Sequence, residues 1–329
     1  MTSSPKYSII VPVFNRPEET DELLNSLVGQ TFKNFEVIII EDGSTIDSKT
    51  VVEKYSSNLS IYYFFKPNSG PGPSRNVGFQ KARGEYFVVF DSDCILPSTY
   101  FESVEKFLST ANLDAWGGPD RGHENFTSLQ RAMAHTMSSF LTTGGIRGAK
   151  KIIGNYQPRS FNMGMSRETF LKTDGFRFDR FAEDIELSIR MKKLGLKVGL
   201  IPEAYVFHKR RATLSQFFHQ VSNFGKGRVQ VGESHPGEIK LVHWFPSFFL
   251  MGIFFTPLLF FFNKWMGLAS VLAYWLYFIL IAIEGFLKTK SIRVSIRSIP
   301  SAFIQMAGYG SGFLTQKIKS LQGKNTVGF

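Results

Sequence analysis

Two acidic side chains follow directly on an apolar run of β-forming residues. The run EYFVVF ends at Phe90, and Asp91 and Asp93 come next, separated by one serine. Carboxylates at the end of a strand can bind Mg²⁺ or Mn²⁺ together with the oxygens of a phosphate group. An ordinary turn, in which Ser92 caps the next helix, would also tolerate both charges. The spacing therefore indicates either a metal–phosphate site or a solvated turn.

A second acidic pair, Glu183 and Asp184, opens the helical pattern EDIELSIRMKKLG. A carboxylate within hydrogen-bond reach of a hydroxyl group can remove its proton as that oxygen attacks. Acids in a first turn also stabilise a helix through its dipole, and the two roles are compatible. His208 closes the last strand expected in this part of the chain, and a lone histidine at such a place is more often structural than a ligand.

The elements that would position these side chains alternate between strand and helix. Continuous apolar runs predict buried strands over residues 7–15, 35–44, 60–68 and 85–93. Segments with helical spacing separate them, which is typical of an α/β fold with a mostly parallel sheet covered by helices on both faces. Ligands bind such sheets beyond the carboxyl ends of the strands. Polar residues gather there after three of the runs, at Pro12 to Asn15, at Glu41 and Asp42, and at the two aspartates.

Two long apolar stretches towards the C-terminus indicate a membrane. Residues 245–262 carry no charge, and residues 265–287 carry only Glu284. Each is long enough as a helix, at about 1.5 Å per residue, to cross a hydrocarbon core, and two in tandem predict a hairpin rather than one buried core helix. Residues 299–314 are shorter and interrupted by glycine and polar residues, so they predict either an interfacial helix or a third crossing.

The net charge of +11 is concentrated beside these apolar stretches. Flanking basic residues favour the cytoplasmic side and attract anionic lipid headgroups. Residues 1–200 contain no basic helix or aromatic-basic platform, which argues against nucleic-acid binding. The single cysteine, Cys94, excludes an internal disulfide. We therefore expect a protein of the inner (plasma) membrane whose catalytic part faces the cytoplasm.

Five motifs, in this order between residues 8 and 195, resemble the family 2 glycosyltransferases. They are SIIVPVFNR, QTFKNFEVIIIEDGS, PSRNVGFQKARGEYFVVFDSD, FNMGMSRETF with DGF, and EDIELSIRMKKLG. The resemblance implies the GT-A fold and an inverting enzyme that transfers a sugar from a nucleotide-diphosphate donor, usually a uridine diphosphate sugar, to an acceptor hydroxyl. It also implies Mn²⁺ or Mg²⁺ as a cofactor.

The resemblance also implies roles for individual residues. Asp93 and His208 would bind the metal, and Asp184 would act as the base. The expected nucleotide-binding residues are Pro12, Val13, Asn15, Asp42, Arg75 and Asp91. Asp42 would accept the N3–H of uracil, which cytosine lacks, although Glu41 departs from the aspartate that usually precedes it. The expected sugar-side or acceptor-side residues are Trp116, Gly117, Gly118, Asn162 and Glu183, for which loop packing is the alternative.

Processive members of this family carry a Q-x-x-R-W motif, whereas here Gln216 is followed by Phe-Phe-His. We therefore expect transfer of a single sugar to a lipid-linked or membrane-proximal glycan acceptor, in cell-surface polysaccharide or glycolipid synthesis. The alternatives are a processive polysaccharide synthase and a non-catalytic, sugar-nucleotide-binding membrane partner. The expected domains are a nucleotide-sugar half (1–110), an acceptor and base half (111–235), a transmembrane hairpin (243–287), and a basic loop, interfacial or third membrane segment and tail (288–329).

Overall fold

The computed structural model describes residues 4–121, 126–144, 156–209 and 211–323, and it divides the chain into two compact units. We call the described residues up to 121 together with 156–209 the sheet unit. The remaining described residues form the helical unit. Each unit is therefore assembled from two separate stretches of the chain.

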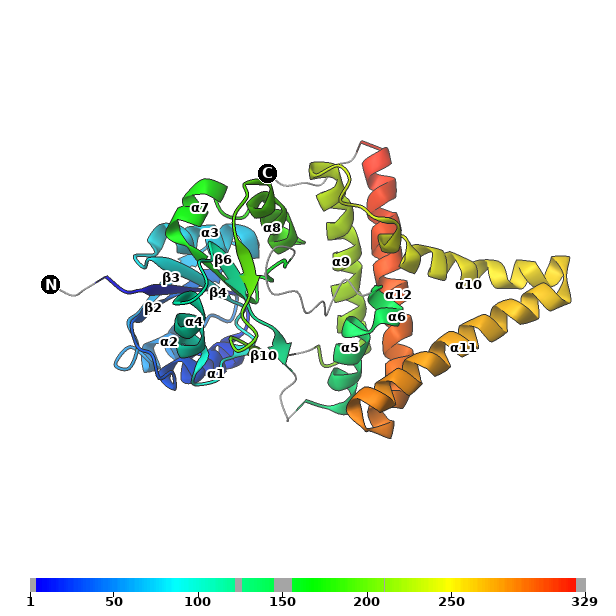
Figure 1. Cartoon of the computed structure of the whole chain (residues 1–329), viewed down its shortest axis with the longest axis horizontal. Helices are drawn as coiled ribbons and strands as arrows, with labels where there is room; N and C mark the ends of the chain where they lie inside the picture. The colour runs from blue at the N-terminus through cyan, green and yellow to red at the C-terminus, as the bar shows by residue number, and fades with distance from the viewer. Residues whose placement is uncertain (1–3, 122–125, 145–155, 210, 324–329) are drawn as a thin grey trace. The chain divides into compact units, whose positions relative to one another are not determined.

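The sheet unit is built on seven strands in the order β3-β2-β1-β4-β8-β6-β9 (Figure 1). Their bounds are β1 Tyr7–Val13, β2 Phe35–Asp42, β3 Ile61–Lys66, β4 Tyr86–Phe90, β6 Ala115–Gly117, β8 Asn162–Ser166 and β9 Val198–Leu200. All neighbouring pairs are parallel except those of β8, which runs antiparallel to β4 and β6. The predicted mostly parallel sheet is therefore confirmed.

Alternating residues of the central strands supply two hydrophobic cores, one on each face of the sheet. Along β1, Ile9 and Val11 lie in the first core and Ile10 lies in the second, because successive side chains of a strand point to opposite faces. The helices that cover the sheet are α1 Pro17–Val28, α2 Lys49–Lys54, α3 Pro71–Lys81, α4 Tyr100–Leu108, α7 Arg167–Thr173 and α8 Glu183–Lys193. The apolar strands β1, β2 and β4 are thus buried on both faces, whereas β3 at the edge of the sheet is only partly buried.

A second, smaller sheet lies beside the end of β4. It has the order β5-β10-β7, with bounds β5 Cys94–Ile95, β7 Asp120–Arg121 and β10 Val206–His208. The antiparallel register of β10 and β5 sets His208 opposite Cys94. A histidine more than a hundred residues away in the sequence is thereby brought next to Asp93.

The helical unit is organised around two helices that lie side by side. Its bounds are α5 Ser128–Ser138, α6 Phe140–Thr143, α9 Leu214–Ser234, η1 Leu241–His243, α10 Phe245–Phe262, α11 Lys264–Thr289 and α12 Ile292–Leu321. A Cβ atom at Gly312 of α12 would lie 2.1 Å from the Ser222 carbonyl oxygen of α9, so glycine permits this close backbone approach. α5 joins them through Met133 and Met137, which pack with Phe217 of α9.

The helices α10 and α11 form a hairpin that leans away from α9 and α12 within the unit (Figure 1). Among the described residues, these two helices are long and apolar enough to cross a membrane, and only 17% and 11% of their most apolar windows are buried. Large apolar side chains therefore stay exposed along the hairpin, as a lipid-facing surface requires. The helices indicate membrane association.

One polar cluster ties the hairpin to the rest of the helical unit. Glu284, the sole acid of α11, accepts hydrogen bonds from Ser139 and from Lys288, whose Nζ lies 2.5 Å from Oε1. His135 Nε2 lies 3.6 Å from the same carboxylate. Because an apolar surrounding makes an unpaired carboxylate costly, these contacts bind α5 and the start of α6 to α11.

The structure divides the chain differently from the domains expected from sequence. Residues 126–144 and 211–235 were expected in the acceptor and base half, but they belong to the helical unit. The reason is that the apolar faces of α5 and α9 pack on each other and on α12. Residues 299–314 lie within the single 30-residue helix α12, which is amphipathic and largely packed against its neighbours.

Candidate active site

Asp91 and Asp93 lie in a tight turn at the carboxyl end of β4. The turn is closed by a hydrogen bond of 3.1 Å from the Cys94 backbone N–H to the Asp91 carbonyl oxygen. Asp93 is buried and is paired on both oxygens: Arg16 Nη1 lies 2.5 Å from Oδ2, and His208 Nε2 lies 3.1 Å from Oδ1. The two aspartates are therefore not a solvated turn.

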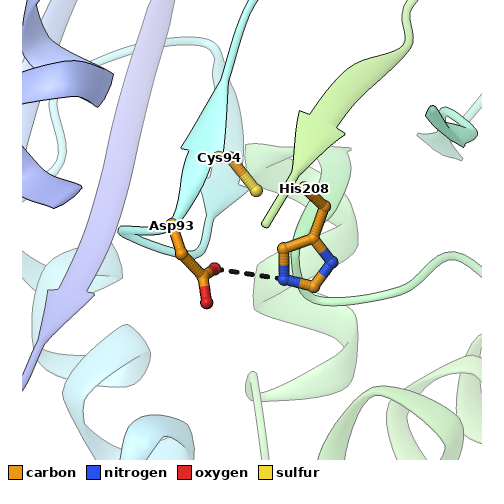
Figure 2. Close-up of side chains that lie close together, drawn as sticks. All are labelled: Asp93, Cys94 and His208. Atoms are coloured by element: carbon orange, nitrogen blue, oxygen red, sulfur yellow. Dashed lines mark ion pairs between the residues drawn. The ribbon is translucent and has the colours of Figure 1, made fainter. Parts of the chain in front are cut away.

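Figure 2 shows how Asp93, Cys94 and His208 converge. One potential ligand atom from each lies within 4.8 Å of the other two. The imidazole of His208 stacks on the Phe161 ring with 4.8 Å between the ring centres, which fixes its orientation. This packing and the strand register together aim one ring nitrogen at Asp93.

The donor atoms at this point fit a divalent cation such as Mn²⁺. Mn²⁺ accepts carboxylate and imidazole ligands, whereas thiolate ligands select softer metal ions. Burial raises the pKa of the Cys94 thiol well above its usual value, and its sulfur donates a hydrogen bond to the Phe161 carbonyl oxygen. The structure thus brings together Asp93 and His208, the two residues that the resemblance implies as metal ligands, and the protonated Cys94 thiol is a poorer ligand than either.

Arg75 joins the aspartate turn to the start of α8. Its Nη2 lies 2.7 Å from Asp91 Oδ1 and its Nη1 lies 2.8 Å from Glu183 Oε1. The side chain is only 2% exposed and also lies over the Phe176 ring. Burial alone would lower the pKa of Arg75, but the Asp91 and Glu183 carboxylates raise it above its usual value. The guanidinium therefore stays charged, and both carboxylates are held by one planar group.

Glu183 and Asp184 occupy different environments although they are adjacent. Burial raises the pKa of Glu183 above its usual value; Arg75 opposes this rise and the nearby Asp184 carboxylate adds to it. Asp184 accepts a 2.8 Å hydrogen bond from the Ile185 backbone N–H, and its other oxygen lies 3.7 Å from Arg159 Nη1. Asp184 is thus the less buried of the two carboxylates, and its nearest ion pair is longer than that of Glu183.

The backbone just before this pair adopts an unusual conformation. Ala182 has a φ of 57°, in the left-handed region that residues with side chains seldom occupy.

Asn15, just beyond the end of β1, has a φ of 54°. Its side-chain oxygen accepts hydrogen bonds from the backbone N–H groups of Thr45 and Ile46, at 2.8 Å and 3.0 Å. Asn15 therefore fastens the loops after β1 and β2 to each other.

Asp42 closes β2 and is held by several donors. Lys66 at the end of β3 pairs with Oδ1, and the backbone N–H groups of Ser69 and Gly70 donate to the two oxygens, each at 2.9 Å. Burial alone would raise the pKa of Asp42, but these hydrogen bonds lower it below its usual value. Asp42 is therefore an ionised acceptor at neutral pH, next to the first turn of the helix that carries Arg75.

The other nucleotide-site predictions lie at the same edge of the sheet. Pro12 is partly exposed, and Val13 is buried in the core at the end of β1. Together with Asn15, Asp42, Asp91 and Asp93 they lie at or just beyond the carboxyl ends of β1, β2 and β4. The structure thus gathers these residues on the rim where an α/β sheet binds ligands.

The residues predicted on the sugar or acceptor side are mostly structural. Trp116 is fully buried, and its ring contacts the rings of Tyr7 and Tyr86. The ring also lies against Gly164 of the antiparallel strand β8, where a side chain would collide with it. Asn162 is equally buried and bonds the Tyr100 hydroxyl and the Ala204 carbonyl oxygen. These two side chains therefore act inside the core. A Cβ atom at Gly118 would lie 1.6 Å from the Ala204 carbonyl oxygen, and one at Gly117 would lie 2.8 Å from the Tyr156 hydroxyl.

Two residues of the site were missed by the sequence analysis. Arg16 contacts Asp93, and Lys66 contacts Asp42. Both are basic residues at or just beyond the carboxyl end of a predicted strand, so the same rule that singled out the acids could have found them.

Comparison with known proteins agrees with this geometry. The model of glycosyl transferase family 2 matches residues 8–172, half of the chain. The mannosyltransferase PcManGT from Pyrobaculum calidifontis, solved with GDP-Man and Mn²⁺, superposes with a TM-score of 0.62 at 15% identity over 98% of this chain and 89% of that one. The predicted GT-A fold is thereby confirmed.

Curated relatives match over shorter regions. Poly(ribitol-phosphate) beta-N-acetylglucosaminyltransferase TarS of Staphylococcus aureus is 35% identical over 113 residues, which is 33% of this chain and 20% of TarS. Cholesterol galactosyltransferase of Borreliella burgdorferi is 36% identical over 110 residues, 33% of this chain and 31% of the relative. The matches thus span less than a third of these relatives. From the family match and the fold, the chain belongs to glycosyl transferase family 2.

Proposed function

We propose that this chain is a metal-dependent, inverting glycosyltransferase that moves one sugar from a nucleotide-diphosphate sugar to a hydroxyl group of a lipid-linked or membrane-proximal acceptor. The observation that carries the proposal is the position of Arg75, which contacts Asp91 in the aspartate turn and Glu183 beside Asp184. The guanidinium of Arg75 therefore contacts both the turn that is expected to bind the phosphates and the residue next to the expected base.

Asp184 would supply the base of the reaction. As the acceptor oxygen attacks the anomeric carbon, its proton passes to the Asp184 carboxylate and the bond from that carbon to the diphosphate oxygen breaks. Attack from the side opposite the leaving group inverts the anomeric carbon. Glu183 would not compete for the proton, because it is buried and bound to Arg75.

Asp93 and His208 would hold the divalent cation, which when bound neutralises charge on the departing diphosphate. The rest of the site would bind and orient the donor. Arg16 extends from the start of α1 to Asp93 and brings a positive charge to the place where the phosphates would lie. Asp42 would contact the base of the nucleotide.

The metal assignment can be measured directly. Asp93→Asn is expected to weaken Mn²⁺ binding about a hundredfold, because the amide oxygen carries no charge for the cation. Mn²⁺ binding to the purified full chain with uridine diphosphate would be followed by electron paramagnetic resonance, alongside hydrolysis of a panel of nucleotide sugars with Mn²⁺ or with EDTA. Asp47→Asn, an exposed acid after β2, is the control. Unchanged Mn²⁺ affinity in Asp93→Asn would contradict the assignment, and EDTA-resistant transfer would contradict metal dependence.

The acceptor is proposed from the hairpin and the relatives. The names of TarS and the cholesterol galactosyltransferase describe transfer to a polymer and to a sterol. The exposed apolar hairpin would hold the enzyme at a bilayer, where a lipid-linked acceptor is found. Four basic residues lie in the last turn of α11, directly after it or in the first two turns of α12, against one at the hairpin tip. This asymmetry favours a cytoplasmic base and a tip across the inner membrane. These basic residues are Lys288, Lys290, Arg293 and Arg297, with Lys264 at the tip.

The proposed orientation predicts which cysteines a membrane-impermeant maleimide can reach. Lys264→Cys at the tip should be labelled from outside intact cells, whereas Arg293→Cys at the base of the hairpin should be labelled only after the cells are broken. The native Cys94 is buried, so it adds little background. Labelling of Arg293→Cys from outside would reverse the orientation.

A further inference from the structure

Exposed apolar residues of α12 lie in one row along the helix. The row, with intervals of four, seven, seven and eleven residues, consists of Ile292, Ile296, Phe303, Gly310 and Leu321. Because an α-helix has about 3.6 residues per turn, these intervals keep all five positions on one face, which we call the apolar face of α12. Its four large side chains are exposed, those of Ile292, Ile296 and Leu321 by 60% or more. Exposed apolar surface of this extent marks a place of contact with a protein or a membrane.

The hairpin of α10 and α11 leaves α12 from the same face. A Cβ atom at Gly310 would lie 2.6 Å from the carbonyl oxygen of Pro246, in the first turn of α10. Ser247 Oγ donates a 3.3 Å hydrogen bond to the Gly310 carbonyl oxygen. Figure 1 shows the two hairpin helices on one side of α12, which runs across their base. The apolar face is therefore continuous with the exposed apolar surface of the hairpin.

The opposite face of α12 is covered by α9. Cβ atoms at Gly308 and Gly312 would lie 2.9 Å and 2.1 Å from carbonyl oxygens of α9. The outer side of α9 exposes polar side chains, among them Gln216 and His219. If α12 crossed a bilayer, it would carry α9 with it into the hydrocarbon, where exposed polar side chains are costly. The packing of α12 therefore fits the surface of a bilayer and not its interior.

Two arginines border the apolar face near the start of α12. Arg293 and Arg297 each follow an isoleucine of that face by one residue, and both side chains are exposed. Arg297 Nη1 donates a 2.6 Å hydrogen bond to Ser128 Oγ of α5. Within the described stretches of the chain, neither arginine pairs with a carboxylate. A guanidinium has five N–H donors in a planar fork that fits a phosphate group, so both arginines keep donors for a phosphate beside the apolar face.

We propose that α12 lies along the surface of the bilayer, with its apolar face among the acyl chains, and that Arg293 and Arg297 bind the phosphate groups of anionic phospholipids there. This surface role rests on the proposed function, because it requires the hairpin in a membrane, and it adds the class of lipid that the enzyme binds. A zwitterionic lipid carries an ammonium group that offsets its phosphate, whereas an anionic lipid does not. The two arginines should therefore select anionic lipids.

The position of α12 can be measured with single spin labels on the full chain in lipid nanodiscs, at Ile292→Cys, Phe303→Cys and Leu321→Cys. Their depths are obtained by electron paramagnetic resonance with oxygen and a nickel chelate as relaxants. A surface helix should place all three labels at a similar depth, about 5–10 Å into the bilayer. A crossing helix would separate the two end labels by about 40 Å and overturn the proposal. Three labels in water would overturn it too and would leave the face to a protein partner.

Lipid selectivity is measured on the detergent-purified full chain by native mass spectrometry, as the affinities for phosphatidylglycerol and phosphatidylcholine. Arg293→Gln combined with Arg297→Gln should lower the affinity for phosphatidylglycerol at least about tenfold, since each basic residue at a surface contributes about fivefold. The affinity for phosphatidylcholine should stay the same. Lys49→Gln combined with Lys54→Gln, at two exposed lysines of α2, is the matched control and should bind both lipids like the wild type. A double arginine variant with wild-type preference for phosphatidylglycerol overturns the lipid assignment.

A further spin label at Phe254→Cys, within α10, separates this proposal from the proposed function. It should lie deep in the bilayer, because Phe254 is an exposed residue of the hairpin. A deep Phe254→Cys label together with a failed result for α12 would leave the membrane-bound transferase intact and remove only the surface role. A Phe254→Cys label in water would show that the hairpin stays outside the membrane, and it would defeat the membrane-proximal acceptor as well.

Discussion

Asp184→Asn is expected to lower the turnover of sugar transfer about a thousandfold and to change the affinity for the donor nucleotide by less than about threefold. The amide nitrogen cannot take a proton, whereas its size preserves the shape of the site. Asp184 contacts the backbone of α8 and lies near Arg159, and no hydrogen bond joins it to Asp42 or to Asp93 among the described residues. Binding and proton transfer should therefore separate in this variant.

The measurement combines steady-state kinetics at saturating donor with direct titration of the nucleotide. Glu168→Gln is the matched control, because this acid also lies in the first turn of a helix but is exposed. It should turn over like the wild type. Wild-type turnover in Asp184→Asn would remove Asp184 as the base, and an equally large loss of nucleotide affinity would show that its role is structural.

Most of the sheet and part of the site could be predicted from sequence because both follow local patterns. The run YSIIVPV is apolar at every position except Ser8, which is typical of a strand buried on both faces. The acids of the rim stand where those runs end, so their gathering at one edge follows from strand direction alone. His208 lies beside Asp93 in the structure, but it was named through the family resemblance and not through a local pattern.

Burial inside the site could not be read in the same way. The sequence predicted that Arg75 reaches the base or the pyrophosphate, but the side chain is buried between two carboxylates contributed by segments far apart in the chain. Trp116 was expected beside the sugar and is instead packed among aromatic residues of the core. Each outcome depends on which long-range neighbours the fold supplies, and local spacing does not encode them.

Long-range contacts, which local spacing does not encode, also explain why the sequence left the structure of residues 299–314 open. Glycine and serine interrupt the hydropathy of residues 299–314, so the sequence left an interfacial helix and a third crossing as alternatives. In the structure these small residues lie where α12 approaches α9 closely, so they support one continuous helix. A glycine that lowers hydropathy can thus mark a tight helix contact, and a pattern of single-residue hydropathy cannot distinguish the two cases.

The largest expected loss of stability comes from Arg75→Met, at about 3–5 kcal/mol in the free energy of unfolding. Methionine fills a similar volume but leaves Asp91 and Glu183 without their shared cation, and Glu183 is almost fully buried. Two neighbouring carboxylates would then lie near each other in a poorly solvated place. The cost is therefore the desolvation of unpaired charge and not the loss of a surface salt bridge.

This loss should depend on pH in a defined direction. Without Arg75 the pKa of Glu183 would rise further above its usual value of 4.5, so the folded protein would bind a proton that the unfolded chain has released. Stability then falls as pH increases from 4.5 through the folded pKa. Pulse proteolysis in urea, on the full chain in detergent, should accordingly show a smaller difference from wild type at pH 5 than at pH 8. Arg177→Met, at an exposed arginine, should match the wild type at both. A loss that is equal at the two pH values would mean that packing, and not charge, makes Arg75 important.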